Sequence, residues 1–180
     1  MPIKLIQIIF MLGGVALASC AWPAESQAMS HEQSLAECQN AVDAAAVRLL
    51  PGAGRIAAER GVTLSALAIR AVPALYARSH GEHARIGDKL AGEFDVETNT
   101  IRIALIACQS GRIDQVLAHE LGHALDYAAT NRYHARGEAV LMPQGMPPLS
   151  KEDAADYYGN LMLSRLTEAD RASRIAAYGR

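Results

Sequence analysis

Apolar side chains recur every three or four residues early in the chain, at Leu35, Cys38, Val42, Ala45 and Leu49. This spacing places them on one face of a helix, so it predicts an amphipathic helix over residues 35–49. Pro51 and Gly52 follow. We expect them to end this helix, because proline interrupts the backbone hydrogen bonds.

Two stretches in the middle of the chain alternate between apolar and polar residues, as strands do. Residues 61–72 fit either a strand or an alanine-rich helix. A clearer alternation lies on both sides of Thr98 and Asn99, at Phe94, Val96, Ile101, Ile103 and Leu105. Because Thr98 and Asn99 favour a turn, we expect a β-hairpin there. The polar residues 78–92 are expected to form a loop.

The second half of the chain predicts helices. Residues 109–129 carry apolar side chains at helical spacing, and a connection rich in glycine and proline follows over residues 131–149. Ser150-Lys151-Glu152-Asp153 then resembles a capping box that opens another helix, and Thr167-Glu168-Ala169-Asp170 opens a short last helix in the same way. These elements predict an α+β fold, with one domain over residues 31–180 and a small, mostly antiparallel sheet.

The first twenty residues have the pattern of an export signal. Lys4 is the only charged residue, and a mostly apolar run extends from Leu5 to Ala18. This run is short for a membrane-spanning helix. We therefore expect a signal peptide over residues 1–20 rather than a permanent anchor.

The end of this signal resembles a bacterial lipobox, Leu17-Ala18-Ser19-Cys20. The resemblance implies that Cys20 carries lipid and that residues 21–30 form a polar tether. A rival cleavage site after Ala28 would release a soluble protein. We expect a lipid-anchored protein of the bacterial envelope, in the outer membrane or on the periplasmic face.

Composition narrows the function classes. The chain is 51% hydrophobic and 20% charged, which excludes a disordered protein, and its net charge of -2 offers no basic surface for nucleic acid. With lipid on Cys20, two cysteines remain, Cys38 and Cys108. They form either a disulfide in an oxidising compartment or two buried thiols.

The strongest chemical signal is LAHELGHALDY, residues 117–127. His119 and His123 are four residues apart, so in a helix both imidazoles point to one side and can hold one Zn²⁺ ion. Glu120 can then reach a water on that ion, as in the HExxH signature. Gly122 costs about 1 kcal/mol relative to alanine inside a helix. A residue this small would let another backbone or a substrate approach.

Catalytic zinc takes three protein ligands and keeps one position open, so a third ligand must come from elsewhere. The candidates downstream of the motif are Asp126, His134, Glu138 and Glu152. We expect Glu152, in the first turn of a helix, with Asp156 one turn later orienting one histidine. Asp126 is expected to lie on the helix face or to support a ligand. The alternative for Glu152 is the general preference of acids for helix N-termini.

Together the two motifs resemble a gluzincin, a zinc peptidase whose ligands are two histidines and a glutamate. Residues 90–160, with GEFDVETNTIRI, LAHELGHALDY and EDAAD at 152–156, are similar to the catalytic domain of anthrax-lethal-factor-like peptidases, which include the Pro-Pro endopeptidases. The resemblance implies a zincin-like fold in which a C-terminal helix supplies the third ligand. It also implies a catalytic tyrosine, where this chain has Gly145. Substitutes for it would be Tyr127, Tyr133, His134 and Tyr157.

The expected function is zinc-dependent hydrolysis of a peptide or protein substrate, with Glu120 as general base toward metal-activated water. Two alternatives stay open. One is a non-catalytic zinc-binding lipoprotein that acts as a binding module in the envelope, which the missing tyrosine favours. The other is a structural protein in which the two histidines bind no metal.

Overall fold

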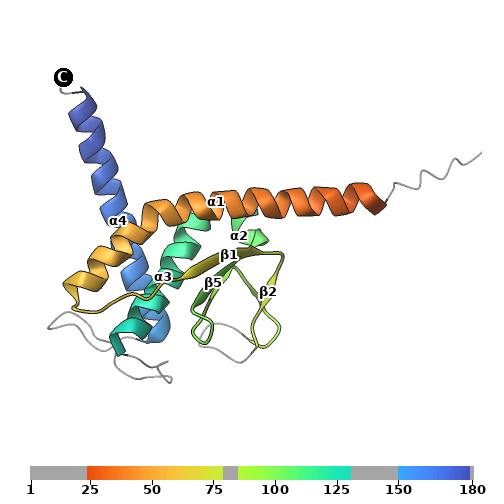
Figure 1. Ribbon diagram of the computed structural model, residues 1–180, viewed down its shortest axis with the longest axis horizontal. Helices are drawn as coiled ribbons and strands as arrows, with labels where there is room; N and C mark the ends of the chain where they lie inside the picture. Colours follow the sequence, from red (N-terminus) through yellow and green to blue (C-terminus); the bar gives the residue numbers. More distant parts are fainter. Residues whose placement is uncertain (1–23, 79–84, 131–149, 179–180) are drawn as a thin grey trace, which may run out of the picture.

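The computed structural model describes residues 24–78, 85–130 and 150–178 (Figure 1). The expected signal peptide and the lipobox cysteine, Cys20, lie outside these residues. None of the helices in the described ranges is long and apolar enough to span a membrane.

The longest helix, α1, covers Ala24–Glu59 (Figure 1). It begins within the expected tether of residues 21–30 and continues through Pro51, so the prediction that Pro51 ends the helix is wrong. Proline in a helix interior costs roughly 3 kcal/mol. The turns beyond Pro51 stay helical because they bury Ala53 and Ile56 in the core, and tertiary packing outweighs this local cost.

A small mixed sheet has the strand order β1-β5-β4. β1 (Ala68–Val72) runs parallel to β5 (Thr100–Ala104), and β4 (Gly92–Asp95) pairs with β5 in the antiparallel direction. The predicted hairpin is confirmed, with Asn99 in the left-handed region at φ 49°. The sheet is mixed rather than mostly antiparallel. The long connection between β1 and β5 allows β5 to enter the sheet parallel to β1.

Two further short elements were not expected from the sequence. β2 (Leu75–Tyr76) and β3 (Lys89–Leu90) form a second, antiparallel pair, so residues 78–92 are not entirely loop. The alternation predicted for the second strand of the hairpin included Leu105. In the structure β5 ends at Ala104, and Leu105 begins the short helix α2 (Leu105–Gln109).

The last helix, α4, covers Lys151–Tyr178. Ser150 caps it as predicted, because its Oγ accepts a hydrogen bond from the N–H of Asp153 at 3.1 Å. The prediction of a separate last helix is wrong. The hydroxyl of Thr167 donates to the carbonyl of Leu163 at 3.1 Å inside the same helix, so it does not cap a new one.

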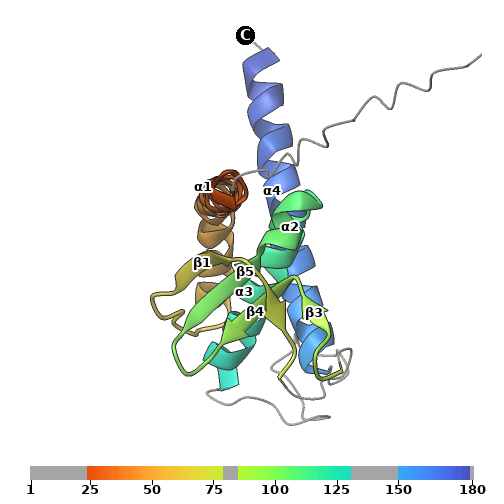
Figure 2. The same cartoon turned by 90° about the vertical axis from the view of Figure 1, so that its right-hand side faces the viewer.

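The helix that carries the motif, α3 (Ile113–Thr130), is the central element of an α+β arrangement. α1 and α3 pack against the mixed sheet, and α4 packs mainly against α3 (Figures 1 and 2). The largest fully buried side chains come from all of these elements: Leu49, Ile56, Ile101, Ile103, Leu117, Leu121, Tyr158 and Met162. Side chains on α3 are therefore held from two sides.

α1 is tied to its neighbours in two places. Cys38 and Cys108 form a disulfide between α1 and α2, with Cα atoms 5.6 Å apart, so the sequence alternative of two free thiols does not hold. The Gln39 side chain accepts a hydrogen bond from the N–H of Ala71 at 2.7 Å. α1 thus covers the outer edge of β1, and β4 is the sheet edge that faces the motif helix.

Candidate functional site

The middle of α3 presents the motif residues beside β4 and α4. Because His119 and His123 are one helical turn apart, their rings meet edge to face, with centroids 4.7 Å apart. The Nε2 atoms of both rings point toward the same carboxylate on α4. The helix spacing read from the sequence therefore produces the expected pair.

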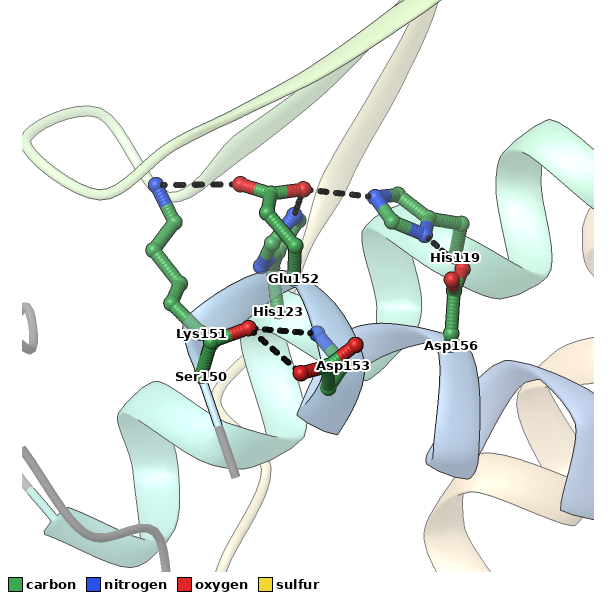
Figure 3. A network of polar contacts seen from close by, with 7 residues as sticks. All are labelled: His119, His123, Ser150, Lys151, Glu152, Asp153 and Asp156. Carbon is green, nitrogen blue, oxygen red and sulfur yellow. Dashed lines mark hydrogen bonds and ion pairs between the residues drawn. The ribbon is translucent and has the colours of Figure 1, made fainter. Parts of the chain in front are cut away.

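Glu152, in the first turn of α4, supplies that carboxylate. Its Oε2 atom lies 3.3 Å from Nε2 of His119 and 3.4 Å from Nε2 of His123 (Figure 3). The three side chains offer ligand atoms within 4.8 Å of one another and could hold a metal ion. Hydrogen bonds from both histidines lower the pKa of Glu152, so it carries a negative charge at neutral pH.

Two glycines bring α3 and α4 close enough to form this group. A Cβ built on Gly122 would overlap the backbone of Ala155, because this Cβ would lie 2.8 Å from the Cα of Ala155. A Cβ on Gly159 would lie 3.1 Å from the carbonyl of Ala118. Gly122 thus lets another backbone approach, as its small size suggested, and this approach positions Glu152.

Asp156 lies one turn after Glu152 and contacts the other nitrogen of His119. Its Oδ1 is 2.7 Å from Nδ1 of the ring, which leaves Nε2 to face Glu152 (Figure 3). Burial lowers the pKa of His119, but its hydrogen bonds to the carboxylates of Glu152 and Asp156 and the charge of Glu120 outweigh this effect and raise that pKa to about 9. Without a metal ion, His119 is therefore protonated at neutral pH.

His123 has a different environment, because only 8% of it is exposed. Burial lowers its pKa and keeps the ring neutral, and its Nδ1 has no hydrogen-bond partner among the described residues.

Asp126 is also buried. Burial raises the pKa of Tyr158, and the charge of Asp126 adds to this effect, which places Asp126 near Tyr158. Asp126 is not part of the three-residue group.

Glu120 lies against strand β4. The backbone N–H of Phe94 donates a hydrogen bond to its carboxylate. A Cβ on Gly92 would lie 2.6 Å from Cγ1 of Val116 and 2.7 Å from Oε1 of Glu120, so any other residue there would displace these side chains. Burial raises the pKa of Glu120 to about 7, against the opposing charge of His119. A carboxyl group with such a pKa can both accept and return a proton near neutral pH.

Lys151 was not identified from the sequence. Its Nζ lies 3.9 Å from Oε1 of Glu152, on the side of that carboxylate away from His119 (Figure 3). The signal in the sequence that could have pointed to Lys151 is its position directly before Glu152, the expected ligand at the start of the helix.

Two of the suggested substitutes for the catalytic tyrosine lie in the described residues. Tyr127 packs on Phe94 with ring centroids 6.3 Å apart, and Tyr157 packs on Tyr158.

The remaining sequence candidates, His134, Glu138 and Tyr133, lie outside the described residues. The structure therefore brings together His119, Glu120, His123, Glu152 and Asp156, from two helices that are separated by the connection 131–149 in the sequence.

A groove of about 390 Å³ adjoins this group between α3, α4 and the start of β4. His119 and Glu120 line its inner end, and Arg112, directly before the start of α3 and about two helical turns before His119, lines its outer end. The candidate metal group, which consists of His119, His123 and Glu152, is thus accessible from a space large enough for part of a ligand.

No protein-family model matches the chain, and comparisons with curated proteins and with solved structures found no match either.

Proposed function

We propose that this chain is a zinc-dependent endopeptidase of the bacterial envelope, with His119, His123 and Glu152 as ligands and Glu120 as general base. The gluzincin resemblance suggested this activity, and the geometry of the ligand atoms supports it. The spacing of these atoms is the single observation on which the proposal rests.

The distances from the Glu152 carboxylate to the two histidines suit a tetrahedral ion. Zinc bonds of about 2.0–2.1 Å in a tetrahedron put neighbouring ligand atoms roughly 3.3–3.4 Å apart. The distances from Oε2 of Glu152 to the two Nε2 atoms are 3.3 and 3.4 Å. Two nitrogens and one oxygen leave one tetrahedral position for water, as in catalytic zinc sites.

Each residue around the ion then has a chemical role. Bound zinc would supply a water whose pKa is near 7 and would polarise the carbonyl of the peptide bond. Glu120 takes the proton from that water and delivers it to the leaving amine, for which its own pKa of about 7 is suited. Asp156 holds the ring of His119, and the ammonium group of Lys151 is the nearby cation that stabilises charge on the carbonyl oxygen.

Replacing the general base tests this mechanism. We expect Glu120→Gln to keep one zinc ion per chain and to lower the rate of peptide hydrolysis by at least about 100-fold, because proton transfer is lost. Glu97→Gln, at an exposed acid in the hairpin turn, is the matched control and should retain wild-type activity. Near wild-type turnover in Glu120→Gln would refute the mechanism. Zinc binding without turnover by the wild type would favour the non-catalytic binding module.

The location in the envelope is part of the proposal. The disulfide between Cys38 and Cys108 supports export, because such bonds persist mainly in oxidising compartments. We expect the wild-type protein to fractionate with membranes and Cys20→Ala to appear in the soluble periplasmic or secreted fraction. Equal membrane association of both proteins would exclude a lipid anchor on Cys20.

A further inference from the structure

The groove beside the metal group follows two antiparallel helices. Gly122 of α3 lies against Ala155 of α4, and Ala118, one turn earlier in α3, lies against Gly159, one turn later in α4. Residues that precede His119 in α3 are therefore opposite residues that follow Asp156 in α4. The walls of the groove come from the start of β4, from Arg112 and the first half of α3, and from α4 beyond Glu152.

The polar side chains at the end of the groove near the metal group differ from those at its far end. The inner end carries the carboxylates of Glu120 and Asp156. The outer end carries the guanidinium of Arg112 and the carboxamides of Gln115 and Asn160, all of which can donate hydrogen bonds. The outer end therefore suits an anionic group, and Arg112 is the only arginine or lysine among the described residues that line the groove.

Asp156 in the groove wall and Asp114, two residues after Arg112 in the sequence, both have other partners. Asp156 contacts Nδ1 of His119 at 2.7 Å. Asp114, in the first turn of α3, pairs with Arg48 of α1 at 2.6 Å. Within the described part of the chain, no ion pair involves Arg112. Its charge is thus left for a ligand.

The length of the groove matches a short piece of peptide. Arg112 precedes His119 by seven residues, which corresponds to about 10 Å along a helix. An extended peptide advances about 3.3 Å per residue. A side chain that reaches Arg112 thus belongs to a residue within about three positions of the bond cleaved at the metal.

We propose that this groove is a specificity subsite for an acidic side chain of the substrate, and that Arg112 selects it by its charge. Val116 and Leu163 line the same space and provide apolar contacts for the methylene groups of that side chain. This inference rests on the proposed peptidase function and names its substrate class: peptides with glutamate or aspartate near the cleaved bond.

A set of matched peptides tests the proposal. The peptides carry glutamate, glutamine or lysine at one of the three positions on either side of the cleaved bond. We expect the wild type to prefer glutamate at one position, with kcat/KM at least about fivefold above glutamine, the scale of one charge-assisted hydrogen bond at an exposed site. Arg112→Glu should reverse the order of the glutamate and lysine peptides.

Arg70→Glu makes the same charge change on the exposed side of β1 and is the matched control. It should keep the wild-type preference, and the zinc content of both variants verifies their fold. Cleavage without any acid preference, or a preference that Arg112→Glu does not alter, would overturn the role of Arg112 while the peptidase function stands.

Binding measurements decide the outcome if no peptide is cleaved, which would itself refute the peptidase function. Labelled glutamate and lysine peptides are titrated into zinc-loaded Glu120→Gln protein, with and without Arg112→Glu. Tighter binding of the glutamate peptide that Arg112→Glu reverses supports the subsite. Equal binding of the two peptides, or no binding of either, overturns it.

Discussion

The two histidines of the metal group differ in their protonation although they are one helical turn apart. Burial keeps His123 neutral, whereas Glu152 and Asp156 outweigh burial at His119 and raise its pKa to about 9. A metal ion must therefore displace one proton, from His119, when it binds at neutral pH. The hydrogen bond that Nδ1 of His119 donates to Asp156 also fixes the orientation of the ring.

This difference predicts how zinc affinity depends on pH. Below a pKa of about 9, His119 of the metal-free protein holds a proton that competes with zinc. Between pH 7 and 9 the apparent affinity should thus rise by about tenfold per pH unit, the dependence for one displaced proton. Competition with a chelator of known pH dependence measures it. An affinity that stays constant over this range would contradict the assignment.

Asp156→Asn is the companion variant for this measurement. It removes one of the contacts that raise the pKa of His119, so the pH at which the affinity levels off should be lower. An unchanged profile would show that Asp156 does not act on the ring.

At the scale of elements, the close approach of α3 and α4 forms the site. Gly122 allows it, because a Cβ there would overlap the backbone of Ala155. Because the two helices pack this closely, the carboxylate of Glu152 lies near Nε2 of both histidines. The position of Glu152, the candidate third ligand, thus depends on how two helices pack, which the sequence spacing within one helix does not determine.

Gly122→Ala tests this dependence. The added methyl group should push α4 away from α3, weaken zinc binding by at least about tenfold and lower the free energy of unfolding by about 1–3 kcal/mol. Gly54→Ala is the control, because a Cβ in that part of α1 meets nothing within 4 Å. It should raise the free energy of unfolding by about 0.5–1 kcal/mol. Wild-type zinc affinity in Gly122→Ala would contradict the role of the helix contact.

Sequence reasoning succeeded where a feature depends on neighbouring residues. The hairpin around Asn99 and the cap at Ser150 are confirmed because turns and caps are local. It failed at Pro51, where burial of Ala53 and Ile56 keeps α1 continuous, and at Thr167, whose hydroxyl bonds to the carbonyl of Leu163 inside α4. The cation at Lys151 and the groove also escaped it, because both depend on contacts between distant segments.

At the scale of the whole molecule, the disulfide joins the long helix α1 to the segment that precedes α3. Cys38 and Cys108 are 70 residues apart in the sequence. The sequence left a bridge and free thiols equally open, because only the fold brings α1 beside α2. The bridge constrains the unfolded chain and lies outside the metal group.

Removing the bridge should therefore affect stability rather than metal binding. We expect Cys38→Ser/Cys108→Ser to lose about 2–4 kcal/mol in the free energy of unfolding, measured with urea, and to keep one zinc ion per chain. Reduced wild-type protein should behave in the same way. An unfolding midpoint equal to that of the oxidised wild type would contradict a stabilising bridge.

The metal content of the purified protein tests the central claim most directly. After dialysis against zinc and removal of the excess, elemental analysis should find one zinc ion per chain in the wild type and in Glu97→Gln. It should find none in His119→Ala and a strongly reduced amount in Glu152→Gln. A wild-type chain that binds no zinc at saturation, or variants that retain it fully, would contradict the account.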